Sequence, residues 1–192
     1  MSELILASSS PFRRELLERL CLPFQCISPD IDEAPQVNES LQDQVTRLAS
    51  SKARKIAGGN ATALIIGSDQ LASCDGEIFS KPGNHQRARE QLRKMAGRTL
   101  IFKTGLCLLN AKTGQEQLDC VDYRVNFRNF SENEIQRYLL AEKPYNCAGS
   151  FKSEKLGICL VESMEGHDPS ALVGLPLIRL TAMLRQEGVD LP

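Results

Sequence analysis

Histidine and closely spaced cysteines are scarce in this chain. Its 192 residues include 2 histidines, and none of its 7 cysteines belongs to a CxxC pair. His85 and His167 occur in turn-like contexts, far from any cysteine pairing. Zinc sites built from cysteine and histidine need these ligands at short, regular spacing. The sequence therefore argues against a structural zinc site.

A strong net charge and a long apolar run are also missing. The 23 basic and 24 acidic residues give a net charge of −1, so the chain lacks the broad basic surface that binds nucleic acid or anionic membranes. No apolar run approaches the ~20 residues of a membrane helix, and the chain begins without a basic segment followed by an apolar one. We expect a cytoplasmic protein with reduced cysteines and with no nucleic-acid or membrane partner.

Length and composition are compatible with one folding unit. With 42% hydrophobic residues, the chain can bury one substantial core, or form two lobes that share a sheet. No repeat, low-complexity tract or long linker interrupts it. The simpler interpretation is a single domain over residues 1–192.

Alternating strand-like and helix-like patterns predict an α/β fold. Apolar or alternating runs predict strands at residues 4–7, 24–31, 61–67, 101–109, 118–127 and 156–161. Capping residues and apolar stripes predict helices after Ser10, Ser40, Asn84 and Ser131, and a last helix that ends at Gly188. The small residues of 147–154, interrupted by a lysine and a glutamate, indicate a loop or strand edge that serves a site.

Two arginines stand where a helix begins. Ser10 is a natural N-cap and Pro11 suits the first helical position, so Arg13 and Arg14 fall in the first turn. A helix start prefers acidic residues by roughly 0.3 to 1 kcal/mol, because its free amides are already positive. A bound phosphate or carboxylate would reverse this balance. The alternative is a pair of solvated arginines.

Lys52 and Asp69 also occupy unexpected positions. Lys52 falls on the apolar stripe of the predicted helix at 40–56, so its ammonium either snorkels past the core edge or points into a cleft that holds an anion. Asp69 follows the apolar run 63–66 and is expected at the carboxyl end of its strand. Ligands usually bind at that edge in open α/β sheets.

Taken together, the misplaced charges suggest a polyphosphate and a divalent metal. The cations are Arg13, Arg14, Lys52, Lys81 and Lys152, and the carboxylates are Glu33, Asp69 and Glu154. Mg²⁺ commonly bridges one or two carboxylates to substrate phosphates. A water molecule activated by Asp69 or by the metal could then attack phosphorus while the cations neutralise the developing charge. Each residue taken singly could equally be a solvated surface charge.

A set of motifs extends over nearly the full length of the chain. They are Ala7-Ser8-Ser9-Ser10-Pro11-Phe12-Arg13-Arg14-Glu15-Leu16-Leu17, Asp32-Glu33, Lys52-Ala53, Gly67-Ser68-Asp69, Asp75-Gly76, Lys81-Pro82, Ala148-Gly149-Ser150-Phe151, Asp168-Pro169 and Val173-Gly174-Leu175-Pro176. Any one of these motifs is weakly specific, and together they are highly specific. Through them the chain resembles the Maf family of nucleoside triphosphate pyrophosphatases.

The resemblance implies an activity and a set of residues for it. It implies cleavage between the α and β phosphates of a nucleotide, with a divalent cation, Mg²⁺ or Mn²⁺, and with Asp69 as proton acceptor. It assigns catalysis also to Lys52, Lys81 and Glu33, and metal binding to Glu33 and Asp69. The residues implied for phosphate binding are Ser8, Arg13, Arg14 and Lys152. The implied fold is an elongated mixed β-sheet flanked by helices, with two lobes and a central cleft, like that of inosine triphosphate pyrophosphatases; a homodimer is compatible with it.

Three positions are most similar to the subgroup that acts on 7-methyl-GTP: Phe12, Gln70 and Glu154. The subgroup that acts on thymidine and uridine triphosphates instead has arginine, threonine and glutamine at the corresponding positions. Methylation of N7 makes guanine cationic, so an aromatic face can stack on the ring and a carboxylate can pair with its N1 and amino protons. The resemblance therefore implies that Phe12, Gln70 and Glu154 determine substrate specificity.

Two departures from the family pattern leave alternatives open. The subgroup usually has tryptophan in place of Phe12, and the family usually has glycine in place of Ser80, which could restrict the approach of backbone to phosphate. One alternative is a pyrophosphatase for UTP and dTTP or of broad specificity. The other is a nucleotide-binding regulator of septum formation.

Overall fold

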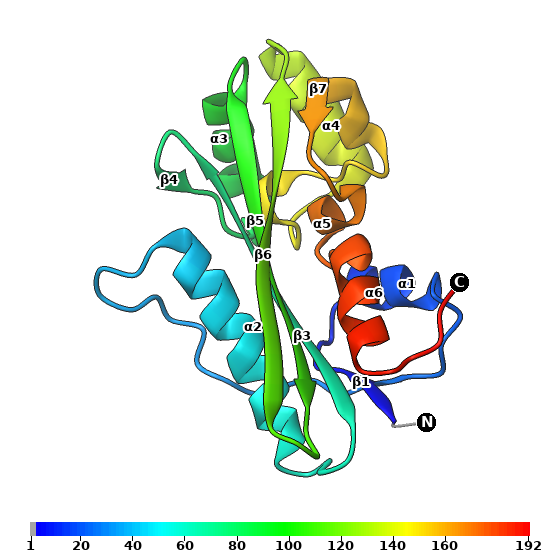
Figure 1. Ribbon diagram of the computed structural model, residues 1–192. Coiled ribbons are helices and arrows are strands. Elements are labelled where there is room, and N and C mark those ends of the chain that lie inside the picture. The colour runs from blue at the N-terminus through cyan, green and yellow to red at the C-terminus, as the bar shows by residue number, and fades with distance from the viewer. Residues whose placement is uncertain (1–2) are drawn as a thin grey trace. The chain divides into compact units, whose positions relative to one another are not determined.

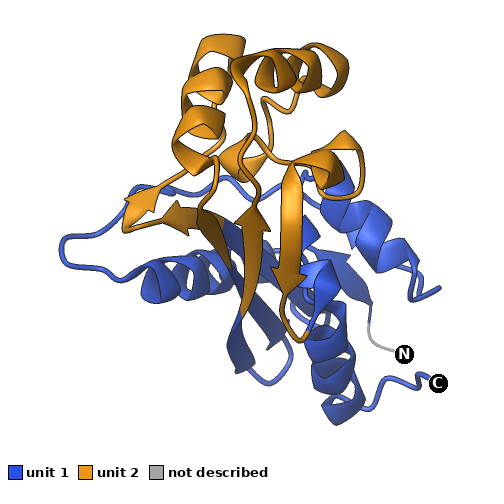
Figure 2. Ribbon diagram, turned by 90° about the horizontal axis from the view of Figure 1, so that it is seen from above, with its two compact units in different colours: residues 1–70, 103–121, 168–192 blue, residues 71–102, 122–167 orange. Residues whose placement is uncertain are grey.

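The computed structural model describes residues 3–192 as a mixed α/β fold (Figure 1). In this part of the chain 7 strands form one mixed sheet in the order β2-β1-β3-β5-β6-β7, and β4 pairs with β3. The chain divides into two compact units (Figure 2). The first unit contains the residues up to 70, then 103–121 and 168–192, and the second contains 71–102 and 122–167.

Three strands contribute residues to both units. They are β3 (Leu64–Cys74), β5 (Thr99–Asn110) and β6 (Gln115–Phe127). The first unit adds β1 (Leu4–Leu6), α1 (Pro11–Glu18), β2 (Gln25–Cys26), α2 (Leu41–Ala57), α5 (Pro169–Val173) and α6 (Leu177–Gln186). The second adds β4 (Glu77–Ile78), α3 (His85–Met95), α4 (Glu132–Glu142), the 3₁₀ helices η1 (Ala148–Ser150) and η2 (Leu156–Leu160), and β7 (Val161–Glu165).

Side-chain alternation along the strands builds two core layers in the first unit. Leu4 and Leu6 of β1 join the cluster formed with α1 and α6, whereas Ile5 between them joins the cluster formed with α2. Successive residues of a strand point to opposite faces, so each apolar strand feeds both layers. Figure 1 shows α2 on one side of these strands, and α1 and α6 on the other.

The absence of a side chain at Gly67 lets α2 lie directly on β3. A Cβ atom built there would stand 2.0 Å from the carbonyl oxygen of Ala49 and 3.1 Å from the amide nitrogen of Ala53. No side chain fits in that space, so helix and strand backbones are in contact. This close approach brings the face of α2 that carries Lys52 against the part of β3 that carries Asp69.

Asp168 joins α5 to α6. Its Oδ1 accepts a hydrogen bond from the N–H of Ser170 at 3.0 Å, which caps α5, and its Oδ2 accepts from the N–H of Ile178 at 2.8 Å in the first turn of α6. The Ser170 hydroxyl accepts from the N–H of Leu177 at 2.7 Å. Free amides at helix starts need such acceptors. One buried carboxylate therefore fixes the angle between the two helices.

In the second unit, Tyr138 of α4 ties down the segment around residue 151. Its hydroxyl donates to the carbonyl oxygen of Ser150 and accepts from the N–H of Lys152, both at 3.1 Å. Phe151 between them is buried with its ring edge-to-face on Phe127, the centroids 5.1 Å apart. Aromatic contact and hydrogen bonds together fix the backbone from which Lys152 projects.

Three predicted strands differ from the observed ones. Residues 24–31 form only the two-residue strand Gln25–Cys26. The strand expected to end at Gly67 runs on to Cys74, so Asp69 lies inside β3 and not at its carboxyl end. Pairing with β1 covers only Leu64–Ile66, and β3 then continues until it pairs antiparallel with β4.

The strand predicted at 156–161 is also wrong. Residues Leu156–Leu160 form a 3₁₀ helix, and the strand begins only at Val161. The N–H of Ile158 donates to the carbonyl oxygen of Lys155 at 3.2 Å, a turn hydrogen bond that extended backbone cannot make. A short apolar run does not distinguish these conformations, because it carries no clear period.

Candidate active site

The centre of the site in the first unit is a buried ion pair. Lys52 of α2 places its Nζ 2.6 Å from Oδ1 of Asp69 on β3, and both residues are less than a tenth exposed. The same Nζ lies 2.6 Å from Oε1 of Glu33, a more exposed loop residue. Of the two sequence interpretations, the structure therefore supports an ammonium that points to anions and not one that snorkels to the surface.

The second oxygen of Asp69 is available to water. In the part of the chain that the structure describes, Oδ2 accepts no hydrogen bond, and no buried side-chain oxygen or nitrogen there lacks a partner. Oδ2 must therefore reach solvent. A carboxylate held by a lysine through one oxygen and open to water at the other has the geometry of a general base.

Arg13 reaches the same region from the first turn of α1. Its Nε donates to the carbonyl oxygen of Gly174 at 2.8 Å. Burial lowers the pKa of Arg13, and the carboxylates of Asp69 and Glu33 raise it in part, so both lie close to the guanidinium. Within residues 3–192 its terminal Nη groups donate to no acceptor and, by the same argument as for Asp69, reach solvent. Such a free fork can bind a carboxylate or phosphate.

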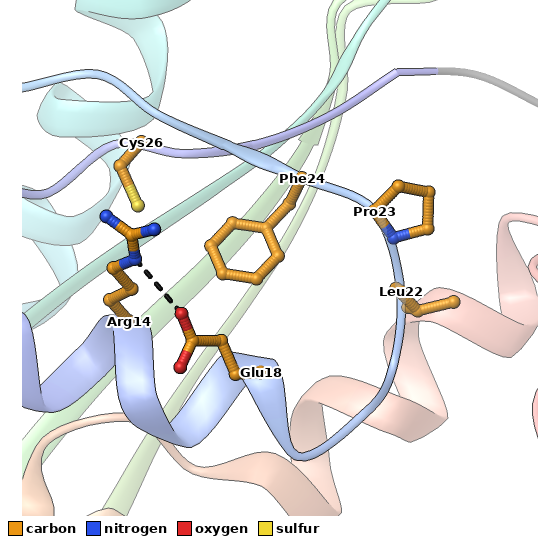
Figure 3. Close-up of a pocket in the computed structure, with 6 residues that line it drawn as sticks. All are labelled: Arg14, Glu18, Leu22, Pro23, Phe24 and Cys26. Atoms are coloured by element: carbon orange, nitrogen blue, oxygen red, sulfur yellow. Dashed lines mark hydrogen bonds and ion pairs between the residues drawn. The ribbon is translucent and has the colours of Figure 1, made fainter.

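Arg14 has a different environment. Its Nε pairs with Oε1 of Glu18, one turn along α1, at 3.0 Å, and both side chains are more than half exposed. The pair lines a cavity of about 380 Å³ together with Leu22, Pro23, Phe24 and Cys26. In Figure 3 the Phe24 ring lies beside the ion pair, to the left of the segment that carries Leu22 and Pro23. The interpretation as a solvated arginine therefore describes Arg14, and a phosphate role for it stays a prediction.

The start of α1 has the capping expected from the sequence. The Ser10 hydroxyl accepts from the N–H of Arg13 at 3.4 Å, and the first turn holds no acidic residue. Ser8 is buried, and its hydroxyl accepts from the N–H of Ser10 at 3.1 Å. Phe12 is partly buried in the same turn. Ser8 and Arg13 thus lie at the positive end of a helix, where an anion is favoured.

Gln70 is held by α5. Its Nε2 donates to the carbonyl oxygens of Ala171 at 2.8 Å and Leu172 at 3.1 Å, and to the hydroxyl oxygen of Thr104 at 3.0 Å. Because carbonyl oxygens accept only, the amide must turn its NH₂ group to α5. The Oε1 atom then faces away from α5, so Gln70 offers a ligand an acceptor.

In the second unit the predicted residues surround a cysteine. Burial raises the pKa of Cys147 to about 11; Lys152 and Lys81 lower it, and Glu154 and Glu142 raise it. All four charged side chains therefore lie near this thiol. Lys152 Nζ is 3.9 Å from Oε2 of Glu142. Lys81, Lys152 and Glu154 thus lie around one thiol in the second unit, and their roles in a site stay a prediction.

Gln91 of α3 connects the two segments that carry these lysines. Its Nε2 donates to the carbonyl oxygen of Ser80 at 2.9 Å, and its Oε1 accepts from the hydroxyl of Ser150 at 2.5 Å. Ser80 is exposed and is not among the residues with positive φ. Serine is therefore accommodated here without strain, in place of the glycine usual in the family.

The carboxylates fit a divalent ion that is shared with phosphate. Among residues 3–192 no group of three or more histidine, cysteine, aspartate and glutamate residues could hold a metal alone. Glu33 and Asp69 nevertheless meet at one ammonium group. Mg²⁺ is typically held by one or two carboxylates, waters and substrate phosphates. The donor set therefore suits an ion that binds together with a polyphosphate.

Sequence reasoning missed the residues that orient the site. Thr104, Gln91, Glu142 and the carbonyl group of Gly174 contact predicted residues through bonds that join distant parts of the chain. Gly174 belongs to a recognised motif, which was the one available signal. The other three occur in ordinary strand or helix patterns.

Comparison with known proteins gives a consistent result. Residues 3–187 match the family described as Maf, "Maf-like protein". A protein of Pseudomonas savastanoi pv. phaseolicola named "7-methyl-GTP pyrophosphatase" is 54% identical over 192 residues, 100% of both chains. A protein of that name from Pseudomonas aeruginosa is 53% identical over 192 residues, 100% of both chains. Another from Methylobacillus flagellatus is 54% identical over 190 residues, 99% of both chains.

Proposed function

The chain belongs to the Maf family, and we propose that it is a 7-methyl-GTP pyrophosphatase, a hydrolase of acid anhydrides. Water attacks the α-phosphorus, the bond to the β-phosphate oxygen breaks, and the products are 7-methyl-GMP and pyrophosphate. The observation that carries this proposal is the buried Lys52–Asp69 pair with Glu33 beside it. The substrate is inferred from relatives that are named for this activity and that match over their whole length.

The residues of the first unit have different roles in the reaction. Asp69 accepts the proton of the attacking water at Oδ2, while Lys52 holds its other oxygen. The Nη groups of Arg13 bind the phosphate oxygens and neutralise the charge that develops on them. Lys81 and Lys152 of the second unit are the further cations proposed for the reaction.

A divalent cation completes the charge balance. Glu33 and Asp69 are the residues that would hold it, and the family typically works with such an ion. When bound, Mg²⁺ or Mn²⁺ withdraws charge from the phosphate oxygens. We expect EDTA to abolish turnover and either ion to restore it.

Base selectivity rests on three residues. Phe12 can stack on the cationic methylguanine ring, which attracts an aromatic face. Glu154 is exposed and can accept hydrogen bonds from the N1 and amino protons of guanine. Gln70 presents Oε1, another acceptor, because its NH₂ group is bound to α5. Either acceptor suits a donor on the edge of guanine.

The direct test is pyrophosphate release from a panel of triphosphates. The purified protein is assayed with 7-methyl-GTP, GTP, UTP and dTTP in the presence of Mg²⁺ or Mn²⁺. We expect the highest kcat/KM for 7-methyl-GTP. A preference for UTP or dTTP would instead indicate a pyrimidine pyrophosphatase, and binding of all four without turnover would indicate a nucleotide sensor.

A further inference from the structure

We propose that Gly174 is a positioning residue: its carbonyl oxygen anchors Arg13 through Nε and so turns both Nη groups toward the substrate. The identity of the anion, the polyphosphate of the nucleotide, rests on the proposed function. Gly174 itself would touch neither substrate nor metal. Its effect on the reaction would pass entirely through the arginine.

The anchor occupies Nε–H, and with it the side-on fork that Nε and one Nη would form together. Arg13 Nε donates to Gly174 O at 2.8 Å, across 161 positions of sequence. Guanidinium is planar and carries five N–H groups, so occupying Nε leaves the end-on fork of the two Nη groups for another acceptor. These groups are the ones that donate to no other described residue and reach solvent.

The carbonyl group is itself held firmly. The fully buried Ser68 donates its hydroxyl to the same oxygen at 2.9 Å. Gly174 ends α5, and its own N–H donates to the carbonyl oxygen of Ala171 at 3.0 Å. Ser68 precedes Asp69 in β3, so one carbonyl oxygen links the strand of the proposed base to the phosphate-binding arginine.

Glycine is required at this position by its backbone. Gly174 has φ 112° and ψ 11°, in the left-handed region that other residues adopt only with strain. A Cβ added there would lie 3.5 Å from Arg13 Nε, which is ordinary contact. A substitution therefore acts through the backbone and the direction of the carbonyl group, not through a steric clash.

The anchor also prevents a competing ion pair. Asp69 and Glu33 lie close enough to raise the pKa of Arg13 against the effect of its burial. A guanidinium without a fixed Nε would be free to pair with either carboxylate, as Arg14 does with Glu18. Pairing with Asp69 would block the oxygen that accepts the proton. The Gly174 carbonyl group thus holds the Arg13 guanidinium close to the Asp69 carboxylate and prevents the two from forming an ion pair.

The experiment compares two glycines that both follow helices of the first unit. Gly174→Ala is the test, and Gly188→Ala is the matched control, because Gly188 has φ 78° and a Cβ there would meet nothing within 4 Å. Both substitutions place alanine at a positive φ. Only the first is expected to lower kcat/KM for 7-methyl-GTP, by about tenfold, and to weaken product inhibition by inorganic pyrophosphate by a similar factor.

A double-mutant cycle separates positioning from general damage. In an Arg13→Ala background, Gly174→Ala should cause no further loss of kcat/KM, because its effect is transmitted by the missing side chain. An equal loss in both backgrounds would overturn the proposal, as would a loss of the same size in Gly188→Ala. If Gly174→Ala does not fold, Ser68→Ala takes its place, with an expected loss of about threefold that again disappears in Arg13→Ala.

The two proposals fail in different ways. If the parent protein does not hydrolyse 7-methyl-GTP, the proposed function is wrong, but binding of inorganic pyrophosphate still reports on Arg13. If the parent is active and Gly174→Ala binds pyrophosphate and turns over like the parent, the positioning role is wrong and the function stands.

Discussion

The two units of this chain hold their charged clusters in different ways. In the first unit Lys52 and Asp69 are buried between α2 and β3, and Nζ of Lys52 lies 2.6 Å from Oδ1 of Asp69. In the second unit Lys81 and Glu154 are exposed, and Nζ of Lys152 lies 3.9 Å from Oε2 of Glu142.

This difference suggests a division of roles. Buried, paired side chains are fixed in orientation and interact strongly, because the surrounding dielectric constant is low. Such an arrangement suits proton transfer. Exposed charges on irregular segments can adjust to a ligand and are screened by salt, which suits recognition. The first cluster is therefore expected to control kcat, and the second to control which nucleotide is chosen.

The largest effect is expected from removal of the proposed base. Asp69→Asn should lower kcat by about a thousandfold, because an amide cannot accept the proton of water at neutral pH. The fold should survive, since Lys52 keeps its ion pair with Glu33. Asp119→Asn, which removes an exposed ion pair with Arg179 in the same unit, is the control. Parental turnover in Asp69→Asn would remove Asp69 from the mechanism.

A buried charge without its partner should destabilise the first unit. Lys52→Met leaves the Asp69 carboxylate buried and unpaired, so the free energy of unfolding should fall by about 3 kcal/mol. Urea unfolding measures this, and adding Asp69→Asn should restore most of the loss. Lys55→Met, on the exposed face of α2, should change little. A similar loss in both lysine variants would mean that the ion pair is not buried in solution.

Removal of a charge in the second unit should change the preference between substrates more than the turnover rate. Glu154→Gln should lower the kcat/KM ratio of 7-methyl-GTP to UTP by about tenfold, because a neutral amide attracts the cationic base less than a carboxylate does. Glu162→Gln on β7 is the matched control, an exposed glutamate of the same unit. An unchanged ratio in Glu154→Gln would contradict the proposed role in specificity.

The smallest effect concerns the helix cap of the second unit. Hydrogen bonds from the N–H and hydroxyl of Ser131 and from Arg128 lower the pKa of Glu134 to about 2. Since the folded value lies below the unfolded value of about 4.3, this glutamate stabilises the fold above pH 4.3 and loses that effect as pH falls toward 2.

Glu134→Gln should therefore show a smaller drop in urea midpoint between pH 5 and pH 2.5 than the parent. Glu15→Gln, an exposed glutamate in α1, should behave like the parent. The cap would be irrelevant to acid stability if Glu134→Gln followed the parental curve.

Local chemistry made several features predictable. The N-cap at Ser10, the capping box of Ser131 with Glu134, and the apolar stripe that includes Lys52 all lie within one helix each, and the structure confirms them. Boundaries were less predictable: β3 continues past Gly67 because of its later strand partners, which no local pattern records.

The environments of Arg13 and Arg14 required the fold. The two residues are adjacent in sequence but project about 100° apart on a helix. One reaches a carbonyl group that comes from near the other end of the chain, and the other pairs with its own helix. A sequence pattern that places an anion at a helix start cannot distinguish them.

By itself the sequence determined which residue types were available: cations at a helix start, a lysine on an apolar stripe, and carboxylates after apolar runs. Family membership follows from these motifs, because they are local strings of residues. Only the tertiary structure decided which of these charges are buried and which partners hold them. Burial and hydrogen bonding depend on contacts between segments that are far apart in the chain, and these contacts determine which lysine lies beside Asp69 and which arginine keeps its fork free.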